Sequence, residues 1–304
     1  MADADKASSV KPRIADVSVL IPAYKASKTI ERALLGVARQ TVLPKEVIVV
    51  VDGPEGETFH AAAAYKNQMG AVVLNVVRQD HQGAGAARNR ALAEASGTYV
   101  AFLDADDEWL PDKLERSLAH LEGSDITFVS HNVRVRAGEE EHIVDCVRHF
   151  KAESEVLFAS IYRRGYISTS TVVVKRKTVI DAGGFDISLA TAQDFDLWLS
   201  ILANTDVRLH IFDEPLTRNY ITEGSITSGT GRRLECCLRI AIDHLPELKK
   251  HAGSAFMSLW FRIVAVHIEA FTAYRMRHQN VKAFMTLARL PFVMAALSFK
   301  ALWL

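Results

Sequence analysis

Residues 98–111 read TYVAFLDADDEWLP, an apolar run that ends abruptly in a cluster of acidic side chains. The run Tyr99–Leu103 is apolar enough for a buried strand, and the acids follow at its carboxyl end. Clustered carboxylates repel one another, so they either spread into water as an ordinary loop or surround a cation. Asp104 and Asp106 would point the same way from an extended strand end, and two carboxylates can share one divalent ion such as Mn²⁺ or Mg²⁺.

Upstream of this stretch, apolar runs predict three further strands, at residues 17–22, 46–51 and 71–77, with helical segments between them. The run EVIVVV at 46–51 is apolar on both faces, as in a parallel strand covered by helices. Strand and helix thus alternate four times before residue 108, which predicts a doubly wound parallel sheet of the α/β class. Pro22, Asp52 and Asp104 end successive strands, where such sheets bind ligands.

Downstream, the sequence predicts an amphipathic helix from Pro111, strands at 125–136, 141–150 and 170–175, and a helix at 192–204. Asp107 and Glu108 are expected to be a charge pair at the start of that first helix. Beyond residue 229 only helices are predicted. We therefore expect a lead-in at 1–16 that is disordered, a domain at 17–228, and a helical extension at 229–304.

Composition excludes several classes of protein. The formal net charge of the 304 residues is zero, so nucleic acid is not expected as the main partner. Three cysteines without CxxC spacing argue against a disulfide framework and a zinc site, and fit a reducing cytoplasm. The first 16 residues have no apolar stretch of the kind found in a signal peptide.

The C-terminal stretch FMTLARLPFVMAALSFKALWL is apolar but is interrupted by Arg289, Pro291 and Lys300. It falls short of the ~18 uninterrupted apolar residues of a membrane span. It is compatible with a helix lying on a membrane surface, and equally with a helix packed on its own domain or on another subunit.

The glycine-rich segment HQGAGAARNRAL at 81–92 resembles a dinucleotide-binding loop only superficially. The third glycine of that motif is replaced by Arg88, and the loop follows the third strand instead of the first. The segment is better interpreted as a helix start that directs Arg88 and backbone N–H groups at an anion, and His81 beside it is placed to touch phosphate. Asp52, before Gly-Pro, is either a turn former or an acceptor for a base N–H.

Together these segments resemble the inverting glycosyltransferases of family 2, which have the GT-A fold. The matching segments, in order, are VSVLIPAYKASKTIERALLGVARQT, EVIVVVDGP, HQGAGAARNRAL, VAFLDADDEW, TVVVKRKTVIDAGGFD, AQDFDLWLSI and YITEGSIT. They span residues 17–228. The resemblance implies a GT-A sheet in which 17–108 bind a nucleotide sugar and 109–228 bind the acceptor.

The resemblance also implies roles for individual residues. Pro22, Ala23 and Tyr24 would border the nucleoside. Asp52 would hold the base, and Arg88 would lie near the base and diphosphate. Asp104 would contact the ribose or the metal, Asp106 would ligate the metal, and Asp194 would be the general base that deprotonates the acceptor hydroxyl. The cation and arginine would stabilise the departing diphosphate.

The sequence departs from the family pattern in several places. Val51 replaces one of two acids, Gly53-Pro54 replaces Gly-Ser, Gln193 replaces a glutamate, and Ser200 replaces an arginine. Asp196 remains an alternative base, although i and i+2 on a helix face apart.

Aromatic side chains near these motifs are assigned by their spacing. Phe195, Trp198 and Leu199 at helical spacing are expected in the core. Trp109 is the candidate for stacking on a sugar or acceptor.

The leading hypothesis is a cytoplasmic, metal-dependent transferase that uses a UDP-sugar or related donor and builds a polysaccharide, glycan or glycolipid. It would act on a saccharide, lipid-linked or other hydroxyl acceptor, in solution or peripherally on the inner membrane face, alone or as an oligomer. A non-catalytic nucleotide-sugar-binding subunit is the main alternative, permitted by Val51 and Gln193. A sugar nucleotidyltransferase is less favoured, because PAYKASKT follows the first strand where a glycine-rich loop would be needed.

Overall fold

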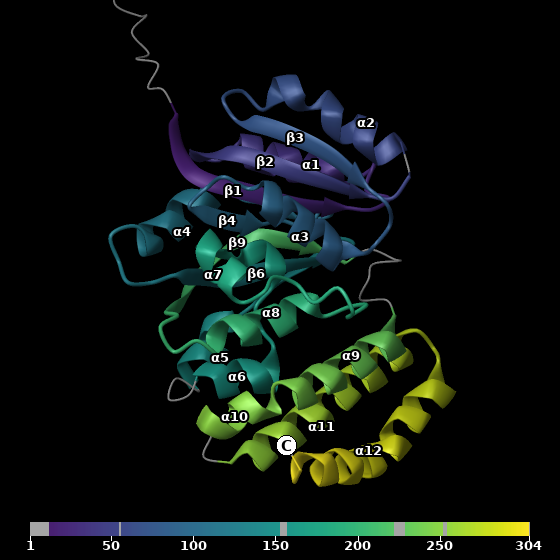
Figure 1. Cartoon of the computed structure of the whole chain (residues 1–304). Coiled ribbons are helices and arrows are strands. Elements are labelled where there is room, and N and C mark those ends of the chain that lie inside the picture. Colours follow the sequence, from purple (N-terminus) through teal and green to yellow (C-terminus); the bar gives the residue numbers. More distant parts are fainter. Residues whose placement is uncertain (1–11, 55, 153–156, 222–228, 252–253, 304) are drawn as a thin grey trace, which may run out of the picture.

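The computed structural model describes residues 12–303, apart from 55, 153–156, 222–228 and 252–253. Its strands form one mixed sheet (Figure 1), in the order β3-β2-β1-β4-β8-β6-β9-β5, with β7 paired to β6. The strands are β1 (Arg13–Ala23), β2 (Val42–Asp52), β3 (Val73–Gln79), β4 (Tyr99–Phe102), β5 (Glu108–Trp109), β6 (Phe128–Ala137), β7 (Glu140–Val144), β8 (Val173–Lys175) and β9 (Leu209–Tyr220).

Strands β1 to β4 are parallel, as predicted, and the second half of the sheet is mixed. β8 runs antiparallel to both β4 and β6, whereas β9 is parallel to β6. The predicted α/β class with a mixed sheet is confirmed. The lead-in prediction is wrong at its end, because residues 13–16 belong to β1 and pair with β2 from Val42 onward. Residues 1–11 lie outside the described part.

Helices cover both faces of the sheet. They are α1 (Ile30–Ala38), α2 (Gly56–Ala64), α3 (Ala84–Glu94), α4 (Lys113–Leu121), α5 (Cys146–Ala152), α6 (Leu157–Arg164), α7 (Arg176–Asp181), α8 (Gln193–Leu202), α9 (Thr230–Asp243), α10 (Leu245–His251), α11 (Ala255–Met276) and α12 (Asn280–Ala301), with 3₁₀ turns η1 (Lys66–Gln68) and η2 (Thr169–Thr171). Figure 1 shows α9–α12 gathered at the opposite end of the molecule from α2 and β3.

Strand β2 shows why the chain forms two hydrophobic cores. Ile48 and Val50 belong to one core with α3, α6 and α8, whereas Val47, Val49 and Val51 belong to the other with α1 and α4. All of these side chains are fully buried. Since successive side chains of a strand face opposite sides, an apolar run without alternation requires helices on both faces, and the fold provides them.

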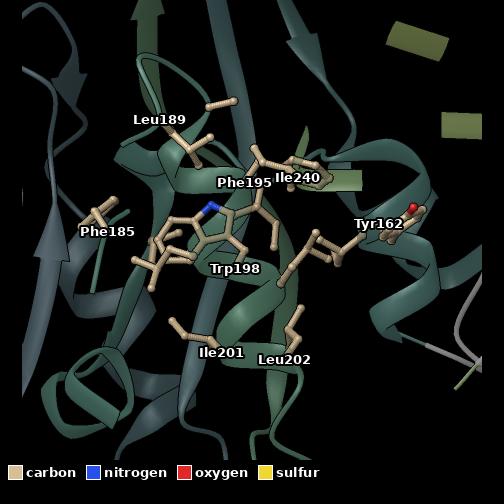
Figure 2. Packing of buried hydrophobic residues seen from close by; sticks show 14 of the residues in the cluster. Tyr162, Phe185, Leu189, Phe195, Trp198, Ile201, Leu202 and Ile240 are labelled. Atoms are coloured by element: carbon tan, nitrogen blue, oxygen red, sulfur yellow. The ribbon is translucent and has the colours of Figure 1, made fainter. Parts of the chain in front are cut away.

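Helix α8 packs its apolar face into the larger core (Figure 2). The ring of Trp198 lies 5.1 Å from that of Phe128 and 5.8 Å from that of Phe102, measured between centroids. Phe195 and Leu199 are also buried. The prediction that Phe195, Trp198 and Leu199 lie in the core is confirmed, because all three belong to the same cluster.

One predicted strand and one strand that was not predicted differ from the sequence analysis in the second half of the sheet. The strand expected at 141–150 ends at Val144, and Cys146 begins α5, because Asn132 Oδ1 accepts hydrogen bonds from the N–H groups of Cys146 and Val147. Strand β9 was not predicted. Its sequence LHIFDEPLTRNY places Asp, Glu and Pro in the middle, which breaks the apolar alternation, and the pairing with β6 shifts register there.

The extension after residue 229 contains only helices among its described residues. α11 packs on α6 and α9, and its residues Leu259, Ile263, Val266 and Ala270 belong to the larger core. α12 packs along α11 but leaves Val281, Phe284, Met285, Phe292 and Phe299 exposed. Both helices have 22 residues and are apolar enough to cross a membrane by length and composition alone, and the most apolar window is 39% buried in α11 and 11% buried in α12.

His131 of β6 and Lys113 of α4 are buried polar side chains without a complete set of partners. His131 Nδ1 lies 2.7 Å from the Asn132 carbonyl, while His131 Nε2 and Lys113 Nζ have no hydrogen-bond partner among the described residues. Burial lowers the pKa of His131 to about 3, and the nearby Lys113 contributes in the same direction. Burial likewise places the pKa of Lys113 well below its usual value. Burial therefore disfavours the charged form of both side chains.

We expect the protein to lose stability as the pH falls from 6.5 towards 3. In this window the unfolded chain binds a proton at His131 that the folded chain does not, whereas above it His131 is neutral in both states. At pH 5 the loss from this residue is about 2 kcal/mol, at 1.36 kcal/mol per pH unit. Urea unfolding at pH 7 and pH 5 should show a smaller difference for His131→Phe than for the unchanged protein. The exposed His142 offers a control, and His142→Gln should keep the original difference. Equal pH dependence in all three proteins would contradict the prediction.

Candidate active site

The carboxyl ends of β1, β2 and β4 meet at one edge of the sheet. Pro22 and Ala23 end β1 beside Val50 and Val51 of β2, and the Leu103 N–H bonds to the Leu20 carbonyl, 3.1 Å away. Asp52 at the end of β2 and Asp104 after β4 therefore lie at the same edge of the sheet, on either side of β1, as the sequence predicted. This edge is the candidate active site.

The Asp52 carboxylate holds the loop that precedes α3. It is 2% exposed and accepts hydrogen bonds of 2.8 Å from Gln79 Nε2, from the Gln82 N–H and from the Gly83 N–H. Gly83 has φ of 93°, a left-handed conformation that favours glycine. Asp52 thus fixes the backbone amides at the start of α3 in place. It acts as the turn-holding residue that the sequence allowed.

Tyr24 and His81 form an open aromatic surface beside Asp52. Their rings are stacked with centroids 4.4 Å apart and an interplanar angle of 26°. His81 Nδ1 lies 2.9 Å from Asp52 Oδ2, which orients the imidazole. Both rings are about half exposed. The sequence placed Tyr24 here but assigned His81 to phosphate, whereas its ring extends the stacking surface.

Arg88 of α3 and Asp104 form the central ion pair, with Nη2 2.6 Å from Oδ1. Burial alone would lower the pKa of Arg88, but the charges of Asp104, Asp194 and Asp106 outweigh burial and raise it. Burial, together with the charge of Asp104, raises the pKa of Asp106 despite the opposing effects of Arg32 and Arg88. The site therefore carries negative charge that its own cations do not fully neutralise.

Helix α3, which carries Arg88, is clamped to a distant segment. Asn89 Nδ2 donates to the Phe185 carbonyl and the Phe185 N–H donates to Asn89 Oδ1, both at 2.8 Å. Gly184 lies against this amide, since a Cβ there would approach Asn89 Oδ1 to 2.7 Å at a φ of 73°. Residues in the segments 87–89 and 183–186, which resemble family motifs, thus also hold α3 against the 183–186 segment.

Asp107 and Glu108 are not the helix charge pair that the sequence suggested. Asp107 is buried and accepts a 2.5 Å hydrogen bond from Ser170 Oγ, and burial with the charges of Asp104 and Asp106 places its pKa well above the usual value. Glu108 lies in β5 and pairs with Arg218 at 2.8 Å. The prediction was wrong because both partners come from strands and turns far along the chain, and α4 begins only at Lys113.

Trp109 is 2% exposed, so it offers no face to a sugar. Its Nε1 donates to the Ser170 carbonyl at 2.8 Å, Lys113 Nζ lies 4.1 Å from the ring centroid, and Gly36 of α1 packs against its backbone. The predicted stacking role is contradicted by this burial. Trp109 therefore anchors the loop that carries Asp104, Asp106 and Asp107, here called the acid loop.

Asp194 is the second residue of α8 and is half-buried. Its Oδ2 accepts a 2.8 Å hydrogen bond from Thr169 Oγ1, and its Oδ1 accepts from the Phe195 N–H at 2.9 Å. The charge of Asp194 acts on Arg88. Asp196 instead faces the C-terminal helices, where its Oδ1 lies 2.7 Å from His244 Nε2. As helical geometry indicated, only one of the two acids faces the acid loop.

The segment Ser168–Thr171 joins the acid loop to Asp194 and was missed by the sequence reasoning. Thr169 bonds Asp194, while Ser170 Oγ lies 3.1 Å from the Asp104 N–H and donates to Asp107. The Ser170 carbonyl also accepts from Thr217 Oγ1 at 3.2 Å. The run STST at 168–171 was the available signal, because consecutive hydroxyls beside a short strand can satisfy several buried carboxylates.

The departures from the family pattern have structural explanations. Gln193 is buried, donates through Nε2 to the Leu189 carbonyl at 2.6 Å and packs over Gly85. Val51 points into the core beneath α1 and is fully buried. Neither side chain is directed at the acid loop.

Asp104 and Asp106 fit a hard divalent cation. They supply carboxylate oxygens, the ligands that Mg²⁺ and Mn²⁺ prefer, and the raised pKa of Asp106 marks negative charge that a cation would relieve. Within the described residues, no group of three or more His, Cys, Asp and Glu side chains could hold a metal by itself. The chain would therefore provide one or two ligands, and a diphosphate would provide others.

Comparisons with known proteins agree with this arrangement. The chain is 27% identical over 219 residues to the Escherichia coli UDP-Glc:alpha-D-GlcNAc-diphosphoundecaprenol beta-1,3-glucosyltransferase WfgD, covering 72% of this chain and 82% of that protein. The fold matches Staphylococcus aureus TarS 1-349 in complex with UDP-GlcNAc at a TM-score of 0.65 and 21% identity, over 92% of this chain and 83% of that one. It also matches the mannosyltransferase PcManGT from Pyrobaculum calidifontis in complex with GDP-Man and Mn²⁺, at a TM-score of 0.61 and 19% identity, over 97% and 90% of the two chains.

The model of the family described as glycosyl transferase family 2 matches residues 18–184, more than half of the chain. This match contains the second half of β1, strands β2 to β8 and the acid loop, so the predicted resemblance and the GT-A fold are confirmed. The chain belongs to glycosyl transferase family 2 and is a glycosyltransferase.

Proposed function

We propose that this enzyme of polysaccharide or glycolipid biosynthesis transfers a sugar from a UDP donor to a hydroxyl of a lipid-linked acceptor, with inversion. The proposal is carried by one observation. The Arg88–Asp104 ion pair and Asp106 lie within electrostatic range of Asp194 at one edge of the sheet. This proximity supports a role for Arg88 in stabilising a leaving diphosphate and a role for Asp194 in accepting a proton.

Donor binding would use the surface formed by Tyr24, His81 and the Asp52 loop. A nucleobase can stack on the exposed aromatic pair, while Pro22 and Ala23 border it from the end of β1. Asp52 would reach the base with a remaining oxygen lone pair, since its carboxylate already orients the 79–83 loop. The donors named for WfgD and bound to TarS are UDP-sugars, which supports uridine as the nucleoside.

Departure of the diphosphate leaves negative charge on its terminal phosphate. Arg88, whose Nε has no hydrogen-bond partner among the described residues, would stabilise this charge, and its carboxylate neighbours keep its guanidinium charged. A divalent cation held by Asp106 and Asp104 would supply Lewis-acid neutralisation of the same charge. The Mn²⁺ complex of the structural neighbour PcManGT supports this choice of cofactor.

Asp194 would take the proton of the acceptor hydroxyl as it attacks. A hydroxyl is a poor nucleophile, and one carboxylate on the face opposite the leaving group is enough for a single inverting displacement. Thr169 Oγ1 donates to Asp194 Oδ2 and thereby fixes the orientation of the carboxylate. We therefore assign Thr169 as a positioning residue for the base.

A lipid-linked acceptor is supported by the C-terminal helices. α12 exposes apolar side chains to solvent, and Lys282, Arg289 and Lys300 are its only charged residues. This combination suits the surface of an anionic membrane. The name of WfgD specifies a diphosphoundecaprenol-linked acceptor. The enzyme would then work peripherally on the cytoplasmic membrane face.

The alternative of a non-catalytic subunit loses its basis, since Gln193 and Val51 both point into the protein. No observation favours a nucleotidyltransferase. The proposed function is tested by incubating the enzyme with a panel of UDP-, GDP- and dTDP-sugars and an N-acetylglucosaminyl diphospholipid. We expect release of UDP that depends on both acceptor and Mn²⁺. Release of nucleoside monophosphate, or equal turnover of all donors in EDTA, would overturn the proposal.

We expect Thr169→Val to lower kcat by about tenfold, corresponding to about 1.4 kcal/mol, with little change in the affinity for UDP. The substitution removes one hydrogen bond to Asp194 while keeping the shape of the side chain. Thr169→Ser, which keeps the hydroxyl, should retain most of the rate. Steady-state kinetics of both variants check this, and an equal loss in both would contradict a positioning role.

A further inference from the structure

A small cavity of about 150 Å³ lies between α9 and α11. Its lining is mostly apolar but contains one arginine. The lining residues are Thr230, Arg233, Leu234, Cys237, Val266, Glu269, Ala270 and Ala273. None of them belongs to the part of the chain that the family model matches.

Arg233 lacks a bonded partner among the described residues. Its backbone N–H bonds to the Gly229 carbonyl, but no hydrogen bond or ion pair to its guanidinium occurs there. By contrast, Arg239 on the same helix pairs with Asp186 and Asp243, each at 3.3 Å. Glu269 faces the same cavity and its charge acts on Arg233, yet the two side chains are not within ion-pair distance. A half-buried arginine with free donors is suited to a phosphate.

Arg233 also acts on the catalytic side of the molecule. The charge of Asp194 acts on both Arg233 and Arg88, so Arg233 and Asp194 lie close enough for their charges to interact. Packing fixes the position of α9 relative to α8, because Leu234 and Ile240 of α9 share a core with Phe195 of α8. Figure 2 shows Ile240 beside Phe195. A ligand on Arg233 would therefore lie close to the base.

Resting on the proposed function, we propose that Arg233 and the α9–α11 cavity bind the diphosphate of a lipid-linked acceptor and the first apolar carbons of its lipid. The diphosphate links sugar and lipid in such a molecule, so it must lie close to the reacting hydroxyl and therefore close to Asp194. Leu234, Val266 and Ala270 offer an apolar wall next to the arginine, which suits a polyprenyl chain. The donor diphosphate is already served by Arg88 and the acid loop.

Farnesyl diphosphate is the probe, titrated calorimetrically into the full-length enzyme saturated with UDP and Mn²⁺, so that the donor site is blocked. We expect binding that Arg233→Ala weakens at least tenfold and Arg233→Lys weakens less. Arg232→Ala is the matched control, because Arg232 is the exposed neighbour on the same helix, and it should bind as the unchanged protein does. Farnesol and inorganic pyrophosphate should each bind more weakly than the intact probe.

Two results would overturn the subsite. Either farnesyl diphosphate does not bind the UDP-saturated enzyme, or Arg233→Ala and Arg232→Ala bind it equally. In turnover with an N-acetylglucosaminyl diphospholipid, Arg233→Ala should raise the acceptor KM about tenfold or more with a smaller change in kcat. If every variant binds UDP in a metal-dependent way but the subsite test fails, only the subsite is rejected. If the unchanged protein does not bind UDP in a metal-dependent way, the proposed function itself is rejected.

Discussion

Asp194→Asn should lower the rate of sugar transfer by about 10²–10⁴-fold while leaving the affinity for UDP unchanged. The amide keeps the shape of the side chain and can still accept from Thr169, whose hydroxyl bonds the present carboxylate. It cannot accept the proton of the attacking hydroxyl. The loss should therefore lie in kcat, measured with saturating donor and acceptor, and calorimetry of UDP should be unaltered.

Asp196→Asn is the matched control, two residues along the same helix. Its carboxylate pairs with His244 and faces the C-terminal helices, so the variant should lower thermal stability and leave kcat within a few-fold of normal. If Asp196→Asn abolished transfer and Asp194→Asn retained it, the assignment of the base would be reversed. If neither lowered kcat, no carboxylate of α8 would act as base.

Asp106→Asn should remove most of the metal-dependent part of UDP affinity. We expect UDP to bind the unchanged protein at least tenfold more tightly in Mn²⁺ than in EDTA, a difference of about 1.4 kcal/mol, and the variant should bind it equally weakly in both. Asp112→Asn, on an exposed residue ahead of α4, should behave as the unchanged protein. Retention of the full Mn²⁺ effect in Asp106→Asn would contradict the assignment.

The same variant should be more stable than the unchanged protein in EDTA. Burial and the charge of Asp104 raise the pKa of Asp106, so the folded state disfavours its ionised form at neutral pH. Replacing the carboxylate by a neutral amide relieves that repulsion, and thermal unfolding in EDTA should occur at a higher temperature. A site that is optimised for a cation would thus be destabilising without one.

The sequence predicted those features that depend on local pattern. Apolar runs predicted β1 to β4. Because parallel strands end at the same edge of a sheet, the sequence also predicted that Asp52 and Asp104 lie close together. The spacing of Asp194 and Asp196 on a helix correctly indicated that only one of them faces the site. These inferences needed nothing beyond strand and helix periodicity.

Features that depend on distant partners were not predictable in this way. Trp109 is buried because Ser170, Lys113 and Gly36 surround it, and Asp107 is buried because Ser170 and Tyr220 satisfy its oxygens. Strand β9 has Asp, Glu and Pro in its middle, and these residues interrupt the apolar alternation by which a strand is recognised. In each case the decisive contact comes from a segment that a one-dimensional pattern does not place.

The Asn89–Phe185 clamp has a kinetic consequence. Because a hydrogen bond weakens steeply beyond ~3.5 Å, α3 cannot slide along the 184–185 segment without losing both bonds. The two hydrogen bonds thus hold α3, which carries Arg88, against the segment that leads towards α8. The separation between Arg88 and Asp194 is then set when the protein folds. Turnover would not have to wait for these two residues to close upon each other, and its rate should be insensitive to solvent viscosity at the chemical step.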